Sequence, residues 1–202
     1  MSVVISGFEP FNGESLNPSW EVARHLEGKM VDNHPLVAVR LPSVFGEAVE
    51  CLWGAVAHLQ PAAILCLGEA GGRSAISVER VAINLEDARI PDNRGQQPRD
   101  RPVIPDGPAA YFATLPVRAI VERLTGAGIP AELSLSAGAF VCNHTLYGLL
   151  HRLGAQSPVR AGFLHVPYLP EQAARHPGKP SMALATMVEG VRLAAAVTLA
   201  GA

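Results

Sequence analysis

Cys142 is the side chain of this 202-residue sequence that is best placed to act as a nucleophile. It follows the glycine-containing segment SAGAFV and begins the stretch CNHTLYGLLHRL, which has the spacing of an amphipathic helix. A thiol in the first turn of a helix lies at the positive end of the helix dipole, which favours the thiolate, and the free N–H groups there could bind an oxyanion. From position alone, a nucleophile and a packed core cysteine fit equally well, because single cysteines are often buried.

The other two cysteines have simpler explanations. Cys51 lies in a helical apolar run and Cys66 in a strand-like apolar run, so we expect both to be inert core residues. The sequence has no CxxC pair and no close Cys/His cluster, and it therefore predicts neither a disulfide framework nor a metal site or other cofactor. A reducing compartment suits these thiols, the amino terminus does not resemble an export signal, and we expect a cytoplasmic protein.

A nucleophilic thiol needs a base, and the base needs a group that orients it. Of the seven histidines, three lie inside helix-like stretches, and His34 and His176 sit beside prolines in expected surface connections. His144 lies two residues beyond Cys142, a helical spacing that turns the two side chains away from each other. His165 in the strand-like segment GFLHVPY is the remaining candidate base. Spacing alone leaves four candidates for the orienting carboxylate: Glu69, Glu79, Glu86 and Asp87.

Short apolar runs alternate with helix-like segments along the chain. This alternation predicts a three-layer α/β/α open sheet, mostly parallel or mixed, with helices on both faces, in a single domain over residues 1–202. Asn17 and Pro18 are typical of a helix N-cap and first-turn proline. The expected strands cover residues 3–6, 36–41, 62–68, 131–135 and 159–166, and an irregular β segment with short strands is expected within residues 69–93. The expected helices cover 18–28, 45–60, a segment from about 116, 142–153 and the carboxyl-terminal stretch.

The segments that follow the expected strands are the place to look for chemistry, because ligands of open α/β sheets bind beyond the carboxyl ends of the strands. Four unusual stretches lie there: GFEPFNG, GEAGGR, the segment leading into Cys142, and GFLHVPY. We expect them to converge on one edge of the sheet. The segment from Ile90 to Pro108 is rich in proline, glycine and charge, and it is predicted to be a long exposed loop, solvated after Asn93.

Composition excludes two classes of partner. With a formal net charge of -2 and 17% charged residues, the chain is not suited to bind nucleic acid or an anionic membrane surface. The carboxyl-terminal stretch is apolar over about the length of a membrane span, but Glu189 and Arg192 interrupt its middle. It is therefore predicted to be a buried or interface helix.

Four runs of the sequence carry a resemblance to a known family: GFEPFNGESLNPSWE, ISVERVAINLEDARIPDN, LSLSAGAFVCN and HVPYLPEQ. Together they resemble the pyroglutamyl peptidase I family of cytosolic cysteine peptidases, also called pyrrolidone-carboxylate peptidases. The resemblance covers residues 3 to about 174 and implies removal of an N-terminal pyroglutamyl residue from peptides by a homo-oligomer, a tetramer or dimer. It implies that Cys142 is the nucleophile, His165 the general base and Glu79 the acid that orients the imidazole.

The resemblance also implies a pocket for the flat, uncharged lactam ring of pyroglutamate. Its expected members are Phe8, Phe11 and Phe140 around the ring, Asn17 as an amide contact, and the backbone around Glu69 and Val141. For each phenylalanine, core packing is the alternative.

The expected oxyanion donors are the backbone N–H of Cys142 and the side chain of Arg89. For Arg89, an ion pair with Asp87 or Asp92 is the alternative.

Two positions depart from the family pattern. Asn12 stands where the family has a second glycine, and it must accept glycine-like backbone geometry, which asparagine tolerates better than most residues. Glu69 stands where the family commonly has glutamine. If its side chain contacts the substrate, a carboxylate there would disfavour the lactam carbonyl.

Three other classes of protein remain as alternatives. A glutamine amidotransferase or another α/β hydrolase, including another thiol-dependent amidohydrolase, would also use a nucleophile at a strand-to-helix turn. Such turns favour glycine two residues to either side, where this chain has Phe140 and His144. A nucleoside phosphorylase would need a phosphate-binding loop, and no clear one is present. An inactive binding protein on this scaffold would lack thiol-dependent activity.

Overall fold

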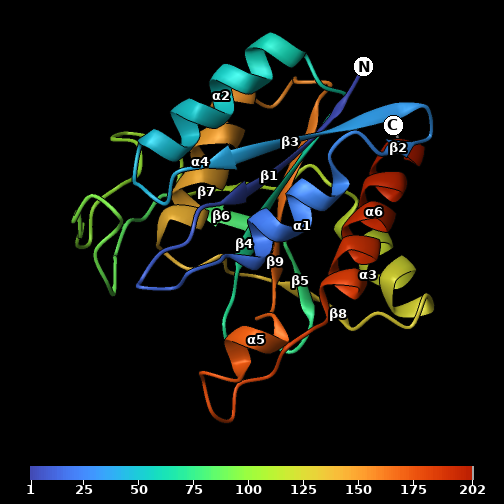
Figure 1. Ribbon diagram of the computed structural model, residues 1–202. Coiled ribbons are helices and arrows are strands. Elements are labelled where there is room, and N and C mark those ends of the chain that lie inside the picture. Colours follow the sequence, from blue (N-terminus) through green and yellow to red (C-terminus); the bar gives the residue numbers. More distant parts are fainter. Residues whose placement is uncertain (202) are drawn as a thin grey trace.

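A seven-stranded β-sheet in the order β2-β3-β1-β4-β9-β5-β8 runs through the computed structural model, which describes residues 1–201 (Figure 1). A small second sheet pairs β6 with β7. The strands are β1 Val3–Phe8, β2 Met30–Val31, β3 His34–Leu41, β4 Ala63–Glu69, β5 Ile76–Glu79, β6 Val81–Ile83, β7 Ala110–Phe112, β8 Ala131–Ser134 and β9 Arg160–Val166. The helices are α1 Pro18–Leu26, α2 Glu47–Leu59, α3 Val117–Gly126, α4 Val141–Leu153, α5 Pro170–Ala173 and α6 Leu184–Ala200.

The main sheet is mixed, within the range that the sequence predicted. Strands β3, β1, β4 and β9 are parallel neighbours, whereas β5 pairs antiparallel with β9 and parallel with β8. The apolar run of β4 is buried on both faces, as its unbroken hydrophobicity predicts for a central strand. The reversal at β5 matters for the site, because it places the antiparallel strand β5 alongside the carboxyl end of β9, where His165 lies.

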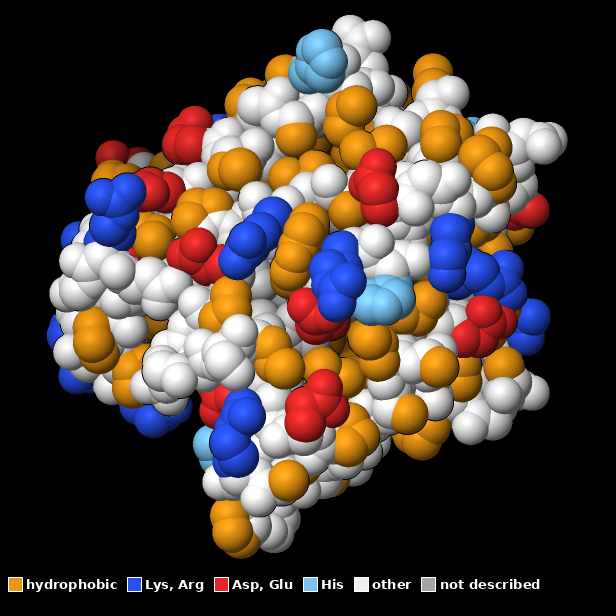
Figure 2. Space-filling view, in the orientation of Figure 1, with side chains coloured by type: hydrophobic (Ala, Val, Ile, Leu, Met, Phe, Trp, Pro, Cys, Tyr) orange, Lys and Arg blue, Asp and Glu red, His pale blue; other side chains and the backbone are white. Residues whose placement is uncertain are grey.

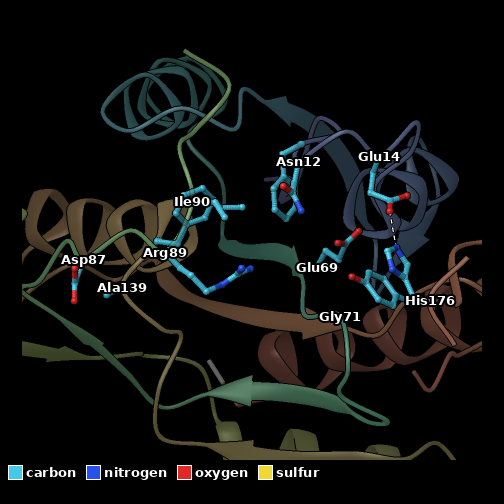
Figure 3. A pocket seen from close by; sticks show the side chains of 12 residues that line it. Asn12, Glu14, Glu69, Gly71, Asp87, Arg89, Ile90, Ala139 and His176 are labelled. Atoms are coloured by element: carbon cyan, nitrogen blue, oxygen red, sulfur yellow. Dashed lines mark hydrogen bonds and ion pairs between the residues drawn. The ribbon is translucent and has the colours of Figure 1, made fainter. Parts of the chain in front are cut away.

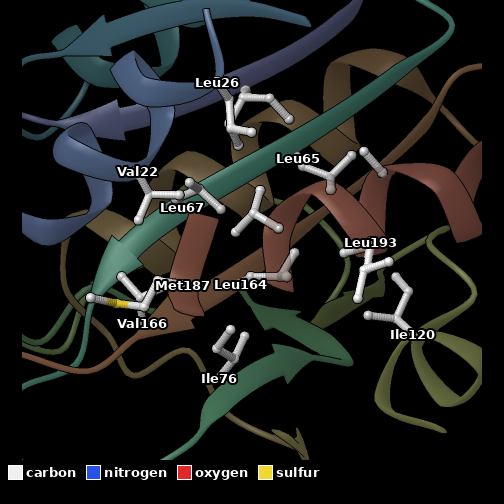
Figure 4. Packing of buried hydrophobic residues seen from close by; sticks show 14 of the residues in the cluster. Val22, Leu26, Leu65, Leu67, Ile76, Ile120, Leu164, Val166, Met187 and Leu193 are labelled. Carbon is white, nitrogen blue, oxygen red and sulfur yellow. The ribbon is translucent and has the colours of Figure 1, made fainter. Parts of the chain in front are cut away.

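Helices cover both faces of the sheet, which confirms the three-layer architecture (Figure 1). On one face, α1, α3 and α6 pack over a core that includes Leu65, Leu164 and Met187 (Figure 4). On the other face, α2 and α4 pack over Ile64, Cys66 and Phe163. The side chains of Leu65 and Cys66, adjacent in β4, therefore enter opposite cores, as expected for a strand with a period of two.

The expected elements lie where the sequence placed them, apart from shifts of a few residues at their ends. Asn17 is the N-cap of α1, since its side chain accepts a hydrogen bond from Ser19 N, and Pro18 opens the helix. The carboxyl-terminal stretch forms α6, whose buried residues include Met187 and Val191. The elements that the sequence did not predict, β2, β7 and α5, have two to four residues each, too few for a periodic pattern.

The structure corrects the expectation for Cys51. Cys66 is fully buried as predicted, but Cys51 is exposed on α2. The buried face of α2 includes Leu52 and Val56, and Cys51 precedes Leu52 by one position, which turns it by about 100° around the helix axis. A cysteine inside an apolar run therefore need not belong to the core.

The surface carries mixed charges and a few large apolar side chains. On the face shown in Figure 2, Lys and Arg side chains are interspersed with Asp and Glu. Met30, Phe112 and Leu135 are 57%, 72% and 69% exposed. Within residues 1–201, none of the helices has both the length and the apolar character that crossing a membrane requires.

We expect Gly7→Ala to destabilise the fold, because β1 and the start of α1 are in backbone contact at this residue. A Cβ atom at Gly7 would lie 2.4 Å from Ser19 O and 2.6 Å from Trp20 N. Overpacking of this kind costs about 1–3 kcal/mol. Gly54→Ala in α2 is the control, since a Cβ there meets open space, and it should gain about 0.5–1 kcal/mol. Urea unfolding measures both, and a Gly7 variant as stable as the wild type would contradict the close contact.

Candidate active site

The thiol of Cys142 lies against the backbone of β4. Cys142 is the second residue of α4, and a Cβ atom at Gly68 would lie 2.9 Å from its Sγ and 2.7 Å from the Phe163 ring. Gly68 therefore allows the amino end of α4 to approach the sheet. No side chain within the described residues caps this helix end, which leaves its first N–H groups free to act as donors.

His165 lies beside this thiol because it is the register partner of Gly68 in the β4–β9 ladder. Its Nδ1 is 2.8 Å from Oε1 of Glu79, which lies on the neighbouring strand β5. An ionised carboxylate accepts only, so Nδ1 carries the proton in the neutral imidazole and Nε2 is free to accept one. This arrangement suits a general base with an orienting acid.

Glu79 is fully buried and ionised. Burial would raise its pKa, but the hydrogen bond and charge of His165, together with Ser134 and Arg73, outweigh burial and lower the pKa. Arg73 donates from Nη1 to Oε1 of Glu79 at 2.8 Å and from Nη2 to the Ser136 carbonyl at 3.2 Å. Arg73 ends the stretch GEAGGR after β4, one of the four unusual stretches, but its role was not predicted from the sequence.

The Cys142 thiol holds its proton in the resting site. Burial raises its pKa to about 12, and the carboxylates of Glu79 and Glu69 add to the shift. Burial thus opposes the helix dipole, although the residue is partly exposed. No hydrogen bond joins Cys142 to His165 in residues 1–201, and such bonds often tighten only when substrate binds. The chemistry that fits is transfer of the thiol proton to His165 during attack.

Asn143 fixes the position of α4, a role that was not predicted from the sequence. Its Oδ1 accepts from Ile83 N at 2.9 Å, and its Nδ2 donates to the carbonyls of Ile83 at 2.8 Å and Leu85 at 3.1 Å. Because the side chain is fully buried, these bonds tie the helix to the β6 segment directly beside the thiol. An Asn next to a candidate nucleophile was the available signal.

His144 points away from the thiol, as its helical spacing predicts. Its Nδ1 is 2.5 Å from Glu86 Oε1, and Gly46 N donates to its Nε2 at 3.2 Å. Glu86 also accepts from Arg101 at 2.5 Å. Both nitrogens of His144 are therefore engaged in a structural pair.

The remaining carboxylates have other partners. Asp87 lies 3.8 Å from Arg99, and Glu69 accepts from Gln172. Of the four carboxylates that spacing left open, the structure brings Glu79 to His165.

The four unusual stretches converge, but not by the route that parallel strands would give. Because β8 runs against β9, its carboxyl end does not lie at the same edge as the ends of β4 and β9. The segment after Ser134 instead carries the chain back to the start of α4. Ala139 and Phe140 of this segment line the cavity beside the thiol.

A cavity of about 350 Å³ opens at this edge of the sheet (Figure 3). Four predicted site residues line it: Phe11, Glu69, Arg89 and Phe140. The rings of Phe11 and Phe140 have centroids 6.1 Å apart. The remaining lining residues are Asn12, Glu14, Gly71, Asp87, Ile90, Ala139, Tyr168 and His176.

Six other predicted site residues do not line this cavity: the catalytic candidates Cys142, His165 and Glu79, which lie beside it, and three residues predicted for the pocket itself. Phe8 is 3% exposed and packs against Phe163 in the core, at a centroid distance of 6.3 Å. The side chain of Asn17 is engaged at the start of α1, where Oδ1 accepts from Ser19 and Nδ2 donates to Glu9 O. Val141 is the first residue of α4, and its side chain is buried in the core.

His176 lies in a connection after α5, as expected, but it also forms part of the cavity wall, which the sequence did not predict. Its Nε2 is 2.7 Å from Glu14 Oε1, its ring stacks on Tyr168 at 4.9 Å, and Arg175 bonds the other oxygen of Glu14 at 2.6 Å. The neighbouring Pro177 suggested a surface turn but carries no information about which way the chain turns.

Arg89 and Asn12 complete the cavity. Asp87 pairs with Arg99, and Asp92 accepts hydrogen bonds from the segment around it, so the alternative of an ion pair for Arg89 is not found in the described residues. In Figure 3 the Arg89 side chain extends toward the centre of the cavity. Asn12 has φ +54, which confirms the glycine-like geometry expected for it.

A family model described as pyroglutamyl peptidase matches residues 1–200. A pyrrolidone-carboxylate peptidase of Gloeobacter violaceus is 62% identical over 193 residues, which are 96% of this chain and 94% of that protein. One of Klebsiella pneumoniae is 58% identical over 197 residues, 98% of this chain and 92% of that protein.

Solved structures agree with this relationship. Pyroglutamyl peptidase I of Bacillus amyloliquefaciens has a TM-score of 0.95 and 44% identity, covering 98% of this chain and 97% of that one. A mutant pyrrolidone carboxyl peptidase of Pyrococcus furiosus has a TM-score of 0.96 and 42% identity, covering 100% and 99%. Fold and relatives define a hydrolase of the peptidase class. Within that class, the chain belongs to the pyroglutamyl peptidase family.

We expect His165→Ala to slow alkylation of Cys142 by iodoacetamide at pH 7 by about a hundredfold, because the raised pKa of the thiol requires a neighbouring base. Peptide mass spectrometry follows each cysteine separately. Cys51 is exposed and serves as an internal control whose rate should not change. Equal labelling of Cys142 in the two proteins would remove His165 from the role of base.

Proposed function

We propose that this protein removes an N-terminal pyroglutamyl residue from peptides through a thioester on Cys142. The observation that carries the proposal is the arrangement of three groups beside the cavity. The Cys142 thiol lies on the amino end of α4 against β4, His165 lies on β9, the strand paired with β4, and Glu79 is hydrogen-bonded to that imidazole at 2.8 Å. The relatives at 58–62% identity are named pyrrolidone-carboxylate peptidases, which supports this choice of substrate.

The cavity supports a substrate with a flat apolar ring and no charge at its amino end. Pyroglutamate has its amine tied into a five-membered lactam, which presents one N–H donor and one carbonyl acceptor. Phe11 and Phe140 provide two aromatic faces for such a ring. Phe140 lies two residues before Cys142, so a ring held against it would present its attached carbonyl to the thiol.

The proposed reaction begins when Sγ of Cys142 attacks the carbonyl carbon of the pyroglutamyl residue. The thiol proton passes to Nε2 of His165, and Glu79 stabilises the imidazolium that forms. The N–H of Cys142, together with Arg89, would stabilise the negative charge on the carbonyl oxygen. His165 then protonates the leaving amine as the C–N bond breaks, which gives a thioester.

Hydrolysis of the thioester completes the cycle. His165 takes a proton from water, the resulting hydroxide attacks the thioester carbonyl, and the C–S bond breaks. The proton returns to Sγ, and free pyroglutamate is released. The residues of this chain suffice for both steps, with no redox change.

We further propose that the 202-residue chain works as one peptidase domain in the cytoplasm, as a homo-oligomer of two or four subunits. The exposed Phe112 and Leu135 support association, because large apolar side chains at a surface favour burial between subunits. Sedimentation equilibrium gives the number, and a monomer would contradict the proposal.

Cys142→Ser should abolish release of a fluorophore from a pyroglutamyl-amide substrate in the presence of reductant. A hydroxyl is a far weaker nucleophile than a thiol at this position, and we expect a loss of at least about a thousandfold in kcat/KM. A prolyl-amide, which lacks the lactam carbonyl, is the control substrate and should not be cleaved.

The outcomes separate the alternatives. Equal activity in Cys142→Ser would return this residue to a packing role. Wild-type activity on other amides but not on the lactam would favour a different thiol-dependent amidohydrolase. No hydrolysis of any blocked peptide would favour a binding protein.

Arg89→Ala should lower kcat by at least about a hundredfold, because loss of one oxyanion donor typically raises the activation free energy by about 3–4 kcal/mol. KM should change little if the contact forms only in the transition state. Arg99→Ala is the matched control, since Arg99 belongs to the same loop but pairs with Asp87. A loss below about tenfold would remove Arg89 from the site.

A further inference from the structure

Glu69 is a carboxyl that lies beside the point where β4 contacts the candidate nucleophile. It ends β4 directly after Gly68, the residue against which Cys142 Sγ packs, and its side chain lies in the middle of the cavity (Figure 3). The proposed mechanism gives it no role. A half-buried carboxyl in a cavity that should receive an uncharged ring therefore requires an explanation.

The partner of Glu69 is a neutral amide with a fixed orientation. Gln172 is fully buried, and its Oε1 accepts from Leu169 N at 3.1 Å. Its Nε2 must therefore point the other way, and it donates to Oε2 of Glu69 at 2.8 Å. This bond holds one carboxyl oxygen in place and leaves the other oxygen on the cavity side.

Charged groups surround Glu69 but do not neutralise it. From the first loop comes Glu14, whose two oxygens are already paired with Arg175 and His176. Burial raises the pKa of Glu69 to about 7; the bond from Gln172 opposes this shift, the charge of Glu14 adds to it and that of His176 opposes it.

The other walls of the cavity contribute further titratable groups. Asp87 and Arg89 come from the loop after β6, and Tyr168 follows β9. The Cys142 thiol does not line the cavity but is close to Glu69, since its Sγ packs at Gly68 and the charge of Glu69 raises its pKa. Arg73, from the same loop as Gly71, is bonded to Glu79 and not to Glu69. The carboxyl of Glu69 thus has a neutral hydrogen-bond donor, while each neighbouring carboxylate, Glu14 and Glu79, has an arginine.

We propose that Glu69 is a substrate-binding residue that works in its protonated form, so that a pyroglutamyl group binds together with one proton at this carboxyl. The inference rests on the proposed function and specifies how its site recognises an uncharged lactam.

The physical reason has two parts. A ring that fills the cavity displaces the water that solvates Glu69, and a buried carboxylate with no cation bonded to it is far more costly than a buried carboxylic acid. In addition, a protonated carboxyl has an O–H that can donate to the lactam carbonyl, whereas a carboxylate can only accept. Both effects favour the protonated form in the complex.

The sign of the pH dependence follows directly. Glu69 is protonated below a pKa of about 7 and ionised above it, so the binding-competent fraction falls as pH rises. Apparent affinity scales with that fraction, and KM should rise by about tenfold for each pH unit above the pKa.

Glu69→Gln tests the proposal, because glutamine has the shape of the protonated acid, can accept from Gln172, and presents an N–H donor that does not titrate. With a pyroglutamyl-amide substrate between pH 6 and 9, we expect wild-type KM to rise by about a hundredfold and KM of the variant to change by less than about threefold.

Two further variants sharpen the test. Glu122→Gln on the exposed face of α3 is the matched control and should follow the wild type. Gln172→Met removes the donor that stabilises ionised Glu69, and it should shift the rise in KM to higher pH, provided that thermal unfolding shows an intact fold. A Gln172→Met profile that shifts to lower pH would overturn the assignment to Glu69.

A binding measurement checks the proton directly. In the Cys142→Ala background, calorimetry of pyroglutamamide binding at pH 8 in two buffers of different ionisation enthalpy should show uptake of about one proton. The additional change Glu69→Gln should abolish that uptake. Equal uptake in both proteins would overturn the inference.

The failure of this inference is distinguishable from the failure of the proposed function. Hydrolysis of the pyroglutamyl amide with identical pH dependence in the wild type and Glu69→Gln would overturn the role of Glu69 and leave the peptidase activity in place. Absence of hydrolysis in both proteins at every pH would overturn both proposals.

Discussion

The site depends on one close contact, the packing of the amino end of α4 on β4 at Gly68. A Cβ atom at Gly68 would lie within 3 Å of both Cys142 Sγ and the Phe163 ring, so glycine is the residue that fits. This contact places the thiol over the strand, beside the register partner His165. It also buries the thiol, which raises its pKa to about 12 and makes the neighbouring imidazole necessary. Asn143 fixes the helix on its other side.

The reversal of strand direction at β5 solves a second problem of placement. The strand β5 is antiparallel to its neighbour β9, and the two are paired near His165. This pairing places Glu79 of β5 next to the imidazole of His165. Burial of that carboxyl is compensated by His165 and by Arg73. The pair of His165 and Glu79 is thus built on two strands, while most of the cavity wall comes from loops. Folded proteins commonly place the residues that determine specificity on loops that a rigid scaffold positions.

The sequence was sufficient for the elements and for part of the site, and the reasons are physical. Helix and strand periodicity predicted the layers, and the position of Cys142 at a helix start was visible in the pattern. The choice of Glu79 among four carboxylates came from family resemblance, because the β5–β9 pairing is a long-range contact that spacing does not encode. His176 was missed for the same reason, since its contact with Glu14 spans 162 positions in the sequence. Cys51 was misjudged because a one-residue offset on α2 separates buried from exposed.

The three glutamates at the candidate site, Glu79, Glu69 and Glu14, differ in how their charge is compensated, and the difference follows from their partners. Glu79 has Arg73 and His165, and Glu14 has Arg175 and His176, so both remain ionised at little cost. The partner of Glu69 is the neutral amide of Gln172. A neutral amide stabilises a carboxylate less strongly than a cation does. When Glu69 is protonated, the remaining two carboxylates, Glu79 and Glu14, are already paired with cations. The site then carries little uncompensated charge that would attract a charged ligand. Selectivity for an uncharged ring can therefore arise from the protonation of a single wall residue, while the ionised Glu79 continues to orient the base.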